Sequence, residues 1–367
     1  MTMLQTMIDV GEGIAWPDAV TQSAIKFLVG RTRLKLRQTP RDADRQFAEA
    51  MTAYPIAVDT AAANAQHYEI PEDFFALVLG PQRKYSCCLY EDGADTLIEA
   101  EERALAATAA HAGLADGQRI LELGCGWGSL SLWMARRYRA AKIVSVSNSH
   151  SQRAFVTGRA KAYGLSNLEV VTTDMNAFVP AGRFDRVVSV EIFEHMSNWR
   201  PLLRRMRDCL DGDGRMFIHV FSNAHASYRF AVEDKEDWIA QHYFTGGIMP
   251  SHGLIRQFPE FSVDAEWRWN GRHYQRTAAD WLQNFDLNGD AIFKILKRVY
   301  GKDARLWQRR WRLFFLATMG LFGHAAGEEW GVSHYRLAPV RAAGRQDANL
   351  RATSVATVAA MPDATAP

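Results

Sequence analysis

The sequence contains few cysteines, and their scarcity limits what the chain can be. Only four occur among 367 residues: Cys87, Cys88, Cys125 and Cys209. Their spacing fits neither a zinc site nor a small disulfide scaffold, and the histidines show no metal-ligand spacing. We therefore expect a protein of the reducing cytoplasm that holds no metal ion.

The sequence also lacks a strong net charge and a long hydrophobic run. Its formal net charge is +2, whereas a nucleic-acid-binding domain carries clustered positive charge. Basic residues gather only at 31–41 and 309–312. We interpret both as solvated helix faces, with contact to anionic lipid headgroups as the alternative. The longest apolar stretch, residues 313–322, is too short to span a bilayer. Asp9 and Glu12 stand where a signal peptide needs a basic and then apolar start. These patterns predict a soluble, cytoplasmic protein with no nucleic-acid partner and at most peripheral membrane contact.

Alternating β-rich and helical runs predict an α/β fold. From residue 119 onward, short β-rich runs alternate with helices, as in βαβ units around a parallel sheet. Two isolated β-runs, 261–269 and 333–337, are expected to complete a mixed seven-stranded sheet with an antiparallel hairpin. The predicted strands before them are 119–123, 142–146, 168–172, 184–190 and 215–221, and the predicted helices are 129–138, 151–163 and 199–210.

The same patterns divide the chain into three parts. Residues 1–60 have helical periodicity and are expected to form an N-terminal helical segment. Residues 61–340 form the main domain, in which the stretches 223–258 and 277–322 interrupt the strand order and are expected to form a cap. Residues 341–367 are rich in Ala, Arg and Thr without periodicity, so we expect a disordered tail.

The strongest local motif is the run Ile-Leu-Glu-Leu-Gly-Cys-Gly-Trp-Gly at 120–128. It follows a predicted strand and opens a helix, where Gly124, Gly126 and Gly128 allow a tight turn and the close approach of a ligand. The pattern predicts a nucleotide-type cofactor site, with a plain βα turn as the alternative. Glu122 precedes the first glycine, and its charge would repel a pyrophosphate but suits a cationic amino acid. The motif therefore favours S-adenosylmethionine (SAM) over a dinucleotide.

Polar residues after the second and third predicted strands complete the cofactor site. The run at 145–152 contains no acidic residue for the ribose hydroxyls, so we expect neutral side chains, Ser147, Asn148 and Gln152, to take that role. After the third strand, Asp174 is expected to accept from the adenine amino group beside Met175, with a helix N-cap as the alternative for Asp174.

The chain resembles the cyclopropane-fatty-acid-synthase superfamily of SAM-dependent methyltransferases, and within it the coclaurine-type N-methyltransferases. The resemblance covers residues 60–337 and implies a Rossmann-like class I methyltransferase fold with N-terminal helices and an inserted helical cap. The matching stretches are 63–71, 84–88, 124–132, 191–195, 244–251 and 329–334.

The resemblance also implies the roles of individual residues. Cyclopropane synthases hold a bicarbonate ion near the methyl group, so bicarbonate is a candidate second cofactor here. The matching SAM contacts are Tyr85, Gly124, Ser147 and Gln152, with Ser86 beside them. The positions that match the bicarbonate ligands are Cys87, Glu194, His219 and Tyr274.

One residue departs from the cyclopropane synthases. Glu191 stands where they commonly have a small residue, and the Glu-x-x-Glu-His pattern of 191–195 is like that of the N-methyltransferases. An amine must lose a proton before or during attack on the methyl group. Either Glu191 or Glu194 could orient the ammonium, and His195 could accept the proton. The alternative is that these residues are helix-start acids with an orienting histidine.

An alkene acceptor would need a different base. Bound bicarbonate could remove the proton from the carbocation. Donors from His219 and Tyr274, together with Glu194 and the backbone of Cys87, would hold the bicarbonate ion. For each residue alone, ordinary core packing is the alternative. The same two interpretations, an acceptor-binding wall or core packing, apply to the aromatic residues Trp238, Tyr243, Phe244 and Trp330.

Our prediction is a SAM-dependent methyltransferase that acts on an amine nitrogen of a hydrophobic small molecule. The alternative enzyme performs C-methylation or cyclopropanation of an unsaturated lipid acyl chain with bicarbonate as base. A SAM-binding regulatory or scaffold protein is the non-enzymatic alternative, and the intact motif at 191–195 argues against it. The sequence leaves open the identity of the acceptor and whether the chain forms a homodimer.

Overall fold

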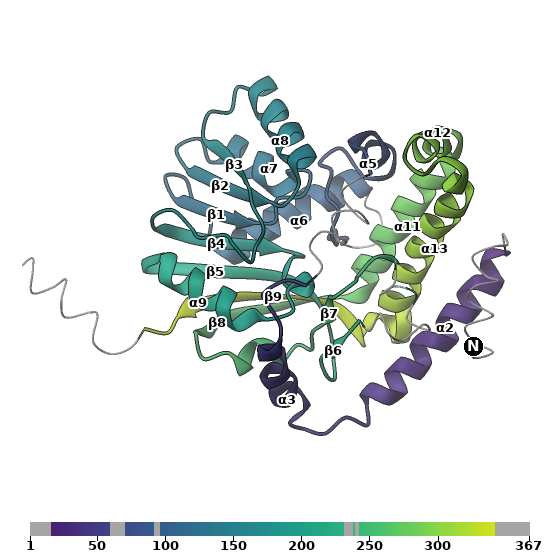
Figure 1. Cartoon of the computed structure of the whole chain (residues 1–367), viewed down its shortest axis with the longest axis horizontal. Coiled ribbons are helices and arrows are strands. Elements are labelled where there is room, and N and C mark those ends of the chain that lie inside the picture. Colours follow the sequence, from purple (N-terminus) through teal and green to yellow (C-terminus); the bar gives the residue numbers. More distant parts are fainter. Residues whose placement is uncertain (1–15, 59–69, 92–95, 231–237, 239–241, 342–367) are drawn as a thin grey trace, which may run out of the picture.

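The computed structural model describes residues 16–58, 70–91, 96–230, 238 and 242–341. Within them the chain forms the expected mixed sheet of seven strands, in the order β3-β2-β1-β4-β5-β9-β8 (Figure 1). β1 to β5 run parallel, and β9 is antiparallel to both of its neighbours. The bounds are β1 Arg119–Leu123, β2 Lys142–Ser147, β3 Leu168–Thr172, β4 Phe184–Val190, β5 Leu210–Asn223, β8 Phe261–Asn270 and β9 Trp330–Pro339.

Helices cover both faces of this sheet and form a separate layer beside it. The helices before the cap are α2 Asp18–Leu36, α3 Ala43–Ala50, α5 Glu72–Val78, α6 Leu97–Ala112, α7 Ser129–Arg137, α8 His150–Ala162 and α9 Trp199–Cys209. Those of the cap are α11 Gly271–Leu287, α12 Gly289–Tyr300 and α13 Ala304–Gly323. The short elements are β6 Tyr228–Arg229, β7 Ile248–Met249 and the 3-10 turns η1 Met51–Ala53, η3 Phe193–His195, η4 Leu254–Gln257, η5 Gly301–Asp303 and η6 His324–Gly327.

The parallel strands are apolar because each side of the sheet is covered. Successive residues of β1 enter two different cores: Ile120 packs with α6, α7 and α8, whereas Leu121 packs with α3 and α9. This explains why the strand reads as a continuous apolar run instead of an alternating one. The side chains of β5 alternate in the same way, so its odd-numbered residues near Phe217 face α6.

The cap is built from three helices where the sequence pattern predicts one helical block. Gly301, which adopts φ 55° in the left-handed region, ends α12 and starts the turn into α13. α13 buries Trp311 and Phe315 in the same core as α11. α2 packs along α13, where Gly320 allows close approach: a Cβ there would lie 2.3 Å from the side chain of Ile25. The cap layer therefore includes part of the N-terminal segment (Figure 1).

The last two strands pair as expected, but they are not joined as a hairpin. β8 and β9 are antiparallel, and α11, α12 and α13 lie between them in the chain. The sequence pattern also gave no indication of α6, although Thr96 and Glu99 form a capping box at its start. Several parts of the predicted segments lie outside the described residues: 342–367 of the expected tail, 1–15 and 59–60 of the N-terminal segment, 63–69 of one matching stretch, and 231–237 and 239–241 of the expected cap.

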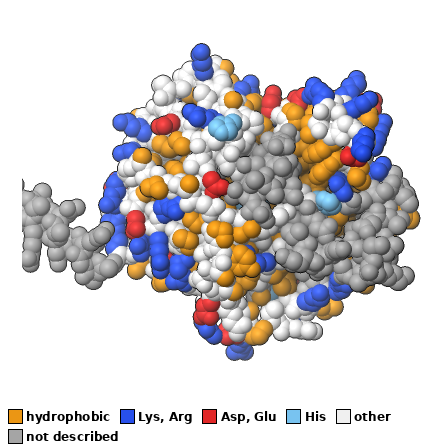
Figure 2. Space-filling model, viewed as in Figure 1, with side chains coloured by type: hydrophobic (Ala, Val, Ile, Leu, Met, Phe, Trp, Pro, Cys, Tyr) orange, Lys and Arg blue, Asp and Glu red, His pale blue; other side chains and the backbone are white. Residues whose placement is uncertain are grey.

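Charged side chains are distributed over the surface. On the face shown in Figure 2, Lys and Arg side chains are spread among Asp and Glu side chains and do not form one continuous field. In one of the two basic stretches, Arg312 is paired with Asp18 and Asp286. None of the helices in the described ranges combines the length and the apolar character needed to cross a bilayer.

Candidate active site

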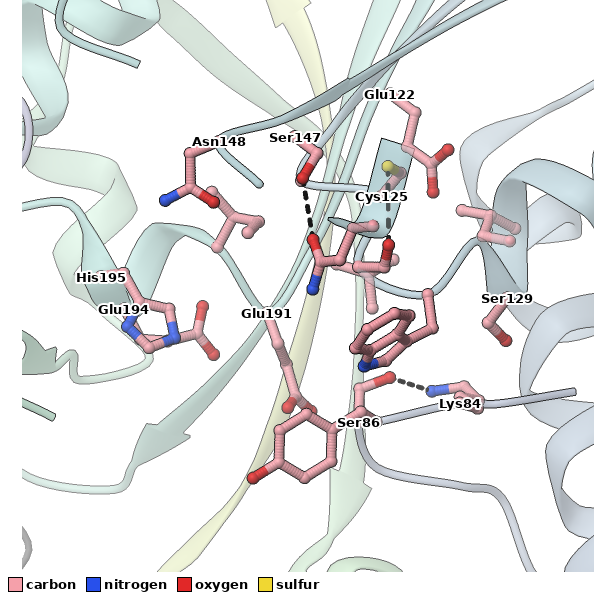
Figure 3. A pocket seen from close by; sticks show the side chains of 18 of the residues that line it. Lys84, Ser86, Glu122, Cys125, Ser129, Ser147, Asn148, Glu191, Glu194 and His195 are labelled. Atoms are coloured by element: carbon pink, nitrogen blue, oxygen red, sulfur yellow. Dashed lines mark hydrogen bonds between the residues drawn. The ribbon is translucent and has the colours of Figure 1, made fainter. Parts of the chain in front are cut away.

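The carboxyl ends of β1, β2 and β4 open onto a cavity of about 190 Å³, which residues of the cap helices α11 and α13 also line. Figure 3 shows side chains of this lining. Parallel α/β sheets bind ligands at this edge. Of the predicted site residues, all line the cavity except Cys87, Asp174 and His219. The lining ones are Tyr85, Ser86, Glu122, Gly124, Gly126, Ser147, Asn148, Gln152, Met175, Glu191, Glu194, His195 and Tyr274.

The glycine loop shapes one wall of the cavity. The amides of Gly124 and Cys125 both donate to Val146 O, at 3.0 and 2.9 Å, which fixes the loop against β2. Gly124 has φ 75°, and a Cβ there would meet the side chain of Ile192 at 2.0 Å. Gly126, at φ 49°, has no atom of the described residues within 4 Å of where its Cβ would be. The loop therefore packs tightly at Gly124 and leaves an open cradle at Gly126.

The acid before the glycines is buried and held by hydroxyls. Glu122 is 2% exposed, and its Oε2 accepts hydrogen bonds from Ser131 of α7 and from Ser145 of β2, the latter at 2.7 Å. Burial raises the pKa of the Glu122 carboxyl, and the two serine hydrogen bonds oppose that shift. One carboxylate oxygen is thus committed to protein donors within the wall of the cavity.

The residues after β2 assemble as a neutral polar group. Ser147 Oγ donates to Gln152 Oε1 at 2.8 Å, and Ser149 Oγ caps α8 by accepting from the Gln152 amide. Asp174 instead caps the turn that follows β3, because its Oδ1 accepts from the Asn176 amide at 2.6 Å. Its contact with adenine stays a prediction, whereas the neighbouring Met175 lines the cavity.

Glu191 is the most heavily coordinated side chain of the site. Its Oε1 accepts from the amide of Cys87 at 2.9 Å and lies 3.1 Å from His219 Nε2, and its Oε2 accepts from the Tyr274 hydroxyl at 2.7 Å. Glu191 also adopts φ 48°, which is unusual for a residue with a side chain and is typical of functional sites. Burial raises the pKa of the Glu191 carboxyl, while the charge of Lys84 opposes the shift.

Glu194 is buried without such support. It is 0% exposed, no side chain of the described residues donates to its carboxylate oxygens, and the backbone amides of Glu194 and Phe221 are the groups that favour its charged form. Burial raises the pKa of Glu194 well above its usual range, and the charge of Glu191 adds to this. The next residue, His195, stacks on Phe244 with ring centroids 5.1 Å apart. The cavity thus contains a carboxyl group that pairs with no side chain of the described residues.

Lys84 is a residue of the site that the sequence analysis missed. It is 2% exposed, and its Nζ donates to Ser86 Oγ at 2.5 Å and to Cys87 O at 2.6 Å. It therefore holds the segment whose amide binds Glu191. The sequence pattern marks the run at 84–88, but only the tertiary structure shows that its lysine lines the cavity and that its charge acts on Glu191. Burial raises the pKa of the Cys87 thiol well above normal, so Cys87 acts through its backbone amide.

Of the two interpretations for the four aromatic residues, core packing holds for three. Phe244 lines the cavity, but Trp238, Tyr243 and Trp330 are buried in the hydrophobic core around α13. Their interpretation as a wall is wrong, because the packing of the cap uses these rings. The other Phe, Trp and Tyr residues that line the cavity are Tyr85, Trp127, Phe221, Tyr274, Trp281 and Phe314.

No group of His, Cys, Asp and Glu in the described part of the chain could hold a metal ion.

The chain is similar in sequence and in structure to known proteins. Residues 57–324 match the family described as mycolic acid cyclopropane synthetase. The chain is 34% identical to (S)-coclaurine N-methyltransferase of Thalictrum flavum subsp. glaucum, over 76% of this chain and 79% of that protein. It is 29% identical to the cyclopropane-fatty-acyl-phospholipid synthase of Escherichia coli (strain K12), over 60% of this chain and 55% of that protein. A crystal structure of coclaurine N-methyltransferase bound to N-methylheliamine and SAH superposes with a TM-score of 0.86 at 29% identity, and covers 91% of this chain and 99% of that chain.

Proposed function

Because the chain belongs to the mycolic acid cyclopropane synthetase family and is a SAM-dependent methyltransferase, we propose that it transfers the methyl group to an amine nitrogen of a hydrophobic small molecule. SAM supplies an electrophilic methyl group, and the residues of the cavity fit it. The cradle at Gly126 leaves room for the ligand, and the neutral group around Ser147 and Gln152 offers hydrogen bonds without repelling charge.

The observation that supports an amine most strongly is the position of the Glu191 carboxylate. Family resemblance assigns Cys87, His219 and Tyr274 to a bicarbonate ion, but here all three contact Glu191. A carboxylate and a bicarbonate ion are planar anions that accept the same donors. The side chain of Glu191 therefore occupies the donors that bicarbonate would need, and this set of residues does not fit the ion.

The state of Glu194 supports a cationic acceptor. A buried carboxylate without a cationic partner is costly, and a positively charged ligand with N–H donors would relieve that cost. A protonated amine provides both the charge and the donors, whereas an unsaturated acyl chain provides neither. Glu194 is therefore proposed to attract and orient the ammonium group of the acceptor.

Glu191 is proposed as the base. An ammonium has no free electron pair, so it must lose a proton before its nitrogen can form the N–C bond while the S–C bond breaks. The raised pKa of Glu191 brings the carboxylate closer to the basicity that proton transfer at neutral pH needs. His195 lines the same cavity and is a second group able to accept a proton. The aromatic side chains of the lining exclude water from the reacting atoms.

One feature favours the alternative, a lipid acceptor. The wall formed by Trp127, Phe221, Trp281 and Phe314 is apolar and could contact an acyl chain. The same wall suits the hydrophobic body of an amine, so it does not outweigh the two carboxyl groups.

The direct test is turnover with purified enzyme and SAM, measured as SAH formation. Secondary amines with an aromatic ring are compared with vesicles of unsaturated phospholipid, each with and without bicarbonate. We expect SAH with the amines, at a rate that does not change when bicarbonate is removed. If the enzyme instead turned over only the phospholipid, and lost this activity when bicarbonate was removed, its function would be cyclopropanation.

A further inference from the structure

A line of three imidazole rings leads from Glu191 away from the cavity. His219 Nε2 lies 3.1 Å from Glu191 Oε1, and His219 Nδ1 lies 2.8 Å from His334 Nε2. His334 Nδ1 in turn lies 2.8 Å from Nδ1 of His111. Each of the two inner rings thus uses both of its nitrogens, and the line ends at the half-buried His111.

The fold places these rings through sheet register and helix packing. His219 of β5 and His334 of β9 are directly paired across the antiparallel ladder, so their side chains lie on the same face. α6 packs against β5 and β9 and brings His111 onto that face. There the ring of His111 stacks on Trp267 of β8, with centroids 3.9 Å apart and planes 3° apart.

The two inner rings are electrically neutral. His219 and His334 are both 0% exposed, and burial lowers the pKa values of both imidazoles well below the usual range. A neutral imidazole has one donor and one acceptor nitrogen, and the hydrogen bond at one nitrogen decides the tautomer. The hydrogens of the line must therefore all point the same way.

The ionised Glu191 carboxylate can only accept hydrogen bonds, so the N–H groups of the line all point toward Glu191. His219 then donates from Nε2 and accepts at Nδ1, and His334 donates from Nε2 and accepts from Nδ1–H of His111. We propose that His334 and His111 are positioning residues that hold His219 as the Nε2–H tautomer and thereby keep Glu191 ionised as the base. This inference rests on the proposed function, in which Glu191 removes a proton from an amine.

Other charged and titratable groups also face these residues, and each of them contributes to the pH profile. Around Glu191 they come from the segment at 84–88, from η3 and from α11, and Arg336 lies near His111. The variants below leave all of these groups in place. The groups near Glu191 are Lys84, Cys87, Glu194, His195 and Tyr274.

The variant His111→Phe tests the proposal without disturbing the core. It keeps a ring to stack on Trp267 and removes the N–H that His334 accepts. Weaker donation to Glu191 raises the pKa of that carboxyl, so the acid limb of kcat/KM should move to higher pH. We expect a shift of about 0.5 pH unit for His111→Phe and about one unit for His334→Phe, which is a roughly tenfold loss on the acid side. Both variants should approach wild-type activity at high pH.

Two comparisons separate positioning from a structural role. His334→Gln keeps a donor near the place of Nε2 and should restore the wild-type profile. The matched control is His324→Phe. His324 is also a partly buried histidine beside a tryptophan, with its ring centroid 5.9 Å from that of Trp330, and its replacement should leave the profile unchanged. Unshifted acid limbs in folded His111→Phe and His334→Phe, or a profile not restored by His334→Gln, would overturn the proposal.

A measurement without turnover tests the inference independently of the acceptor. In ¹⁵N-histidine-labelled wild-type protein, we expect the imidazole signals of His219 to show Nε2 protonated and Nδ1 bare. In His111→Phe, the population of the other tautomer should increase. A His219 ring protonated at Nδ1 in the wild type would overturn the inference, whereas failure of every amine acceptor would count against the proposed function only.

Discussion

Tyr274 donates its hydroxyl to Oε2 of Glu191 at 2.7 Å, across 83 residues of sequence. The donor belongs to α11 of the cap, and the acceptor lies just beyond β4 at the edge of the sheet. The proposed base is therefore supported from the cap as well as from the sheet, so docking of the cap and the basicity of Glu191 are physically linked.

Replacing this tyrosine should change the pH at which the enzyme works. Tyr274→Phe removes a donor to the ionised carboxylate, so the pKa of Glu191 rises and the acid limb of kcat/KM moves to higher pH. We expect about a tenfold loss on the acid side, from the loss of a hydrogen bond to a charged group. Tyr90→Phe is the control, since Tyr90 also donates to a carboxylate of α11, Asp280, at 2.8 Å, but lies outside the lining of the cavity. Equal profiles for the two variants would contradict the role of Tyr274.

Removing the charge of Glu191 should distinguish the two chemistries. Glu191→Gln keeps the size of the side chain but cannot take up the proton of an ammonium, so the rate with an amine should fall about 10²-fold or more. Glu260→Gln replaces another buried carboxylate, which is paired with Arg204 away from the cavity, and should keep its kcat. Steady-state SAH formation measures both. An enzyme that tolerates Glu191→Gln and depends on added bicarbonate would be a cyclopropane synthase in mechanism.

SAM binding should depend on the open cradle of the glycine loop. Gly126→Val places a β-branched side chain into the space beside the ligand and strains a residue at φ 49°, so we expect binding to be lost. Gly164→Val imposes similar strain at φ 63°, with no described atom within 4 Å and outside the lining of the cavity. Calorimetric titration with SAM compares the two. Unchanged binding in Gly126→Val would remove this site assignment.

Glu194, which has no cationic partner among the described residues, should lower the stability of the free protein. Because its folded pKa is raised above the ordinary 4.5, the folded state holds the proton more tightly, and stability is lost as pH rises above that value. Glu194→Gln should therefore melt at a higher temperature than wild type at about pH 8, with the difference disappearing below about pH 4.5.

The same substitution should weaken the binding of a cationic acceptor. Glu194→Gln removes the charge that we propose attracts the ammonium, so KM for the amine should rise while SAM affinity stays the same. A variant that is neither more stable at high pH nor impaired in KM would show that Glu194 already has a partner in the free protein.

The sequence by itself determined the parallel strands, their order along the chain and the glycine loop. These features depend on local patterns: apolar runs of strand length, helical periodicity between them, and glycines at fixed spacing after the first strand. The motif at 191–195 likewise identified two of the carboxyl groups that line the cavity, Glu191 and Glu194, because they lie within five residues.

Only the tertiary structure decided which groups these carboxylates meet. Cys87, His219 and Tyr274 come from three distant segments, and only their packing shows that Glu191 takes the donors that family resemblance assigned to bicarbonate. A tryptophan such as Trp238 or Trp330 looks the same in the sequence whether it lines a cavity or fills a core, so only the packing shows which of the two it does. The line from His219 to His111 depends on the register of β5 against β9 and on where α6 crosses them, and neither is encoded in any local pattern.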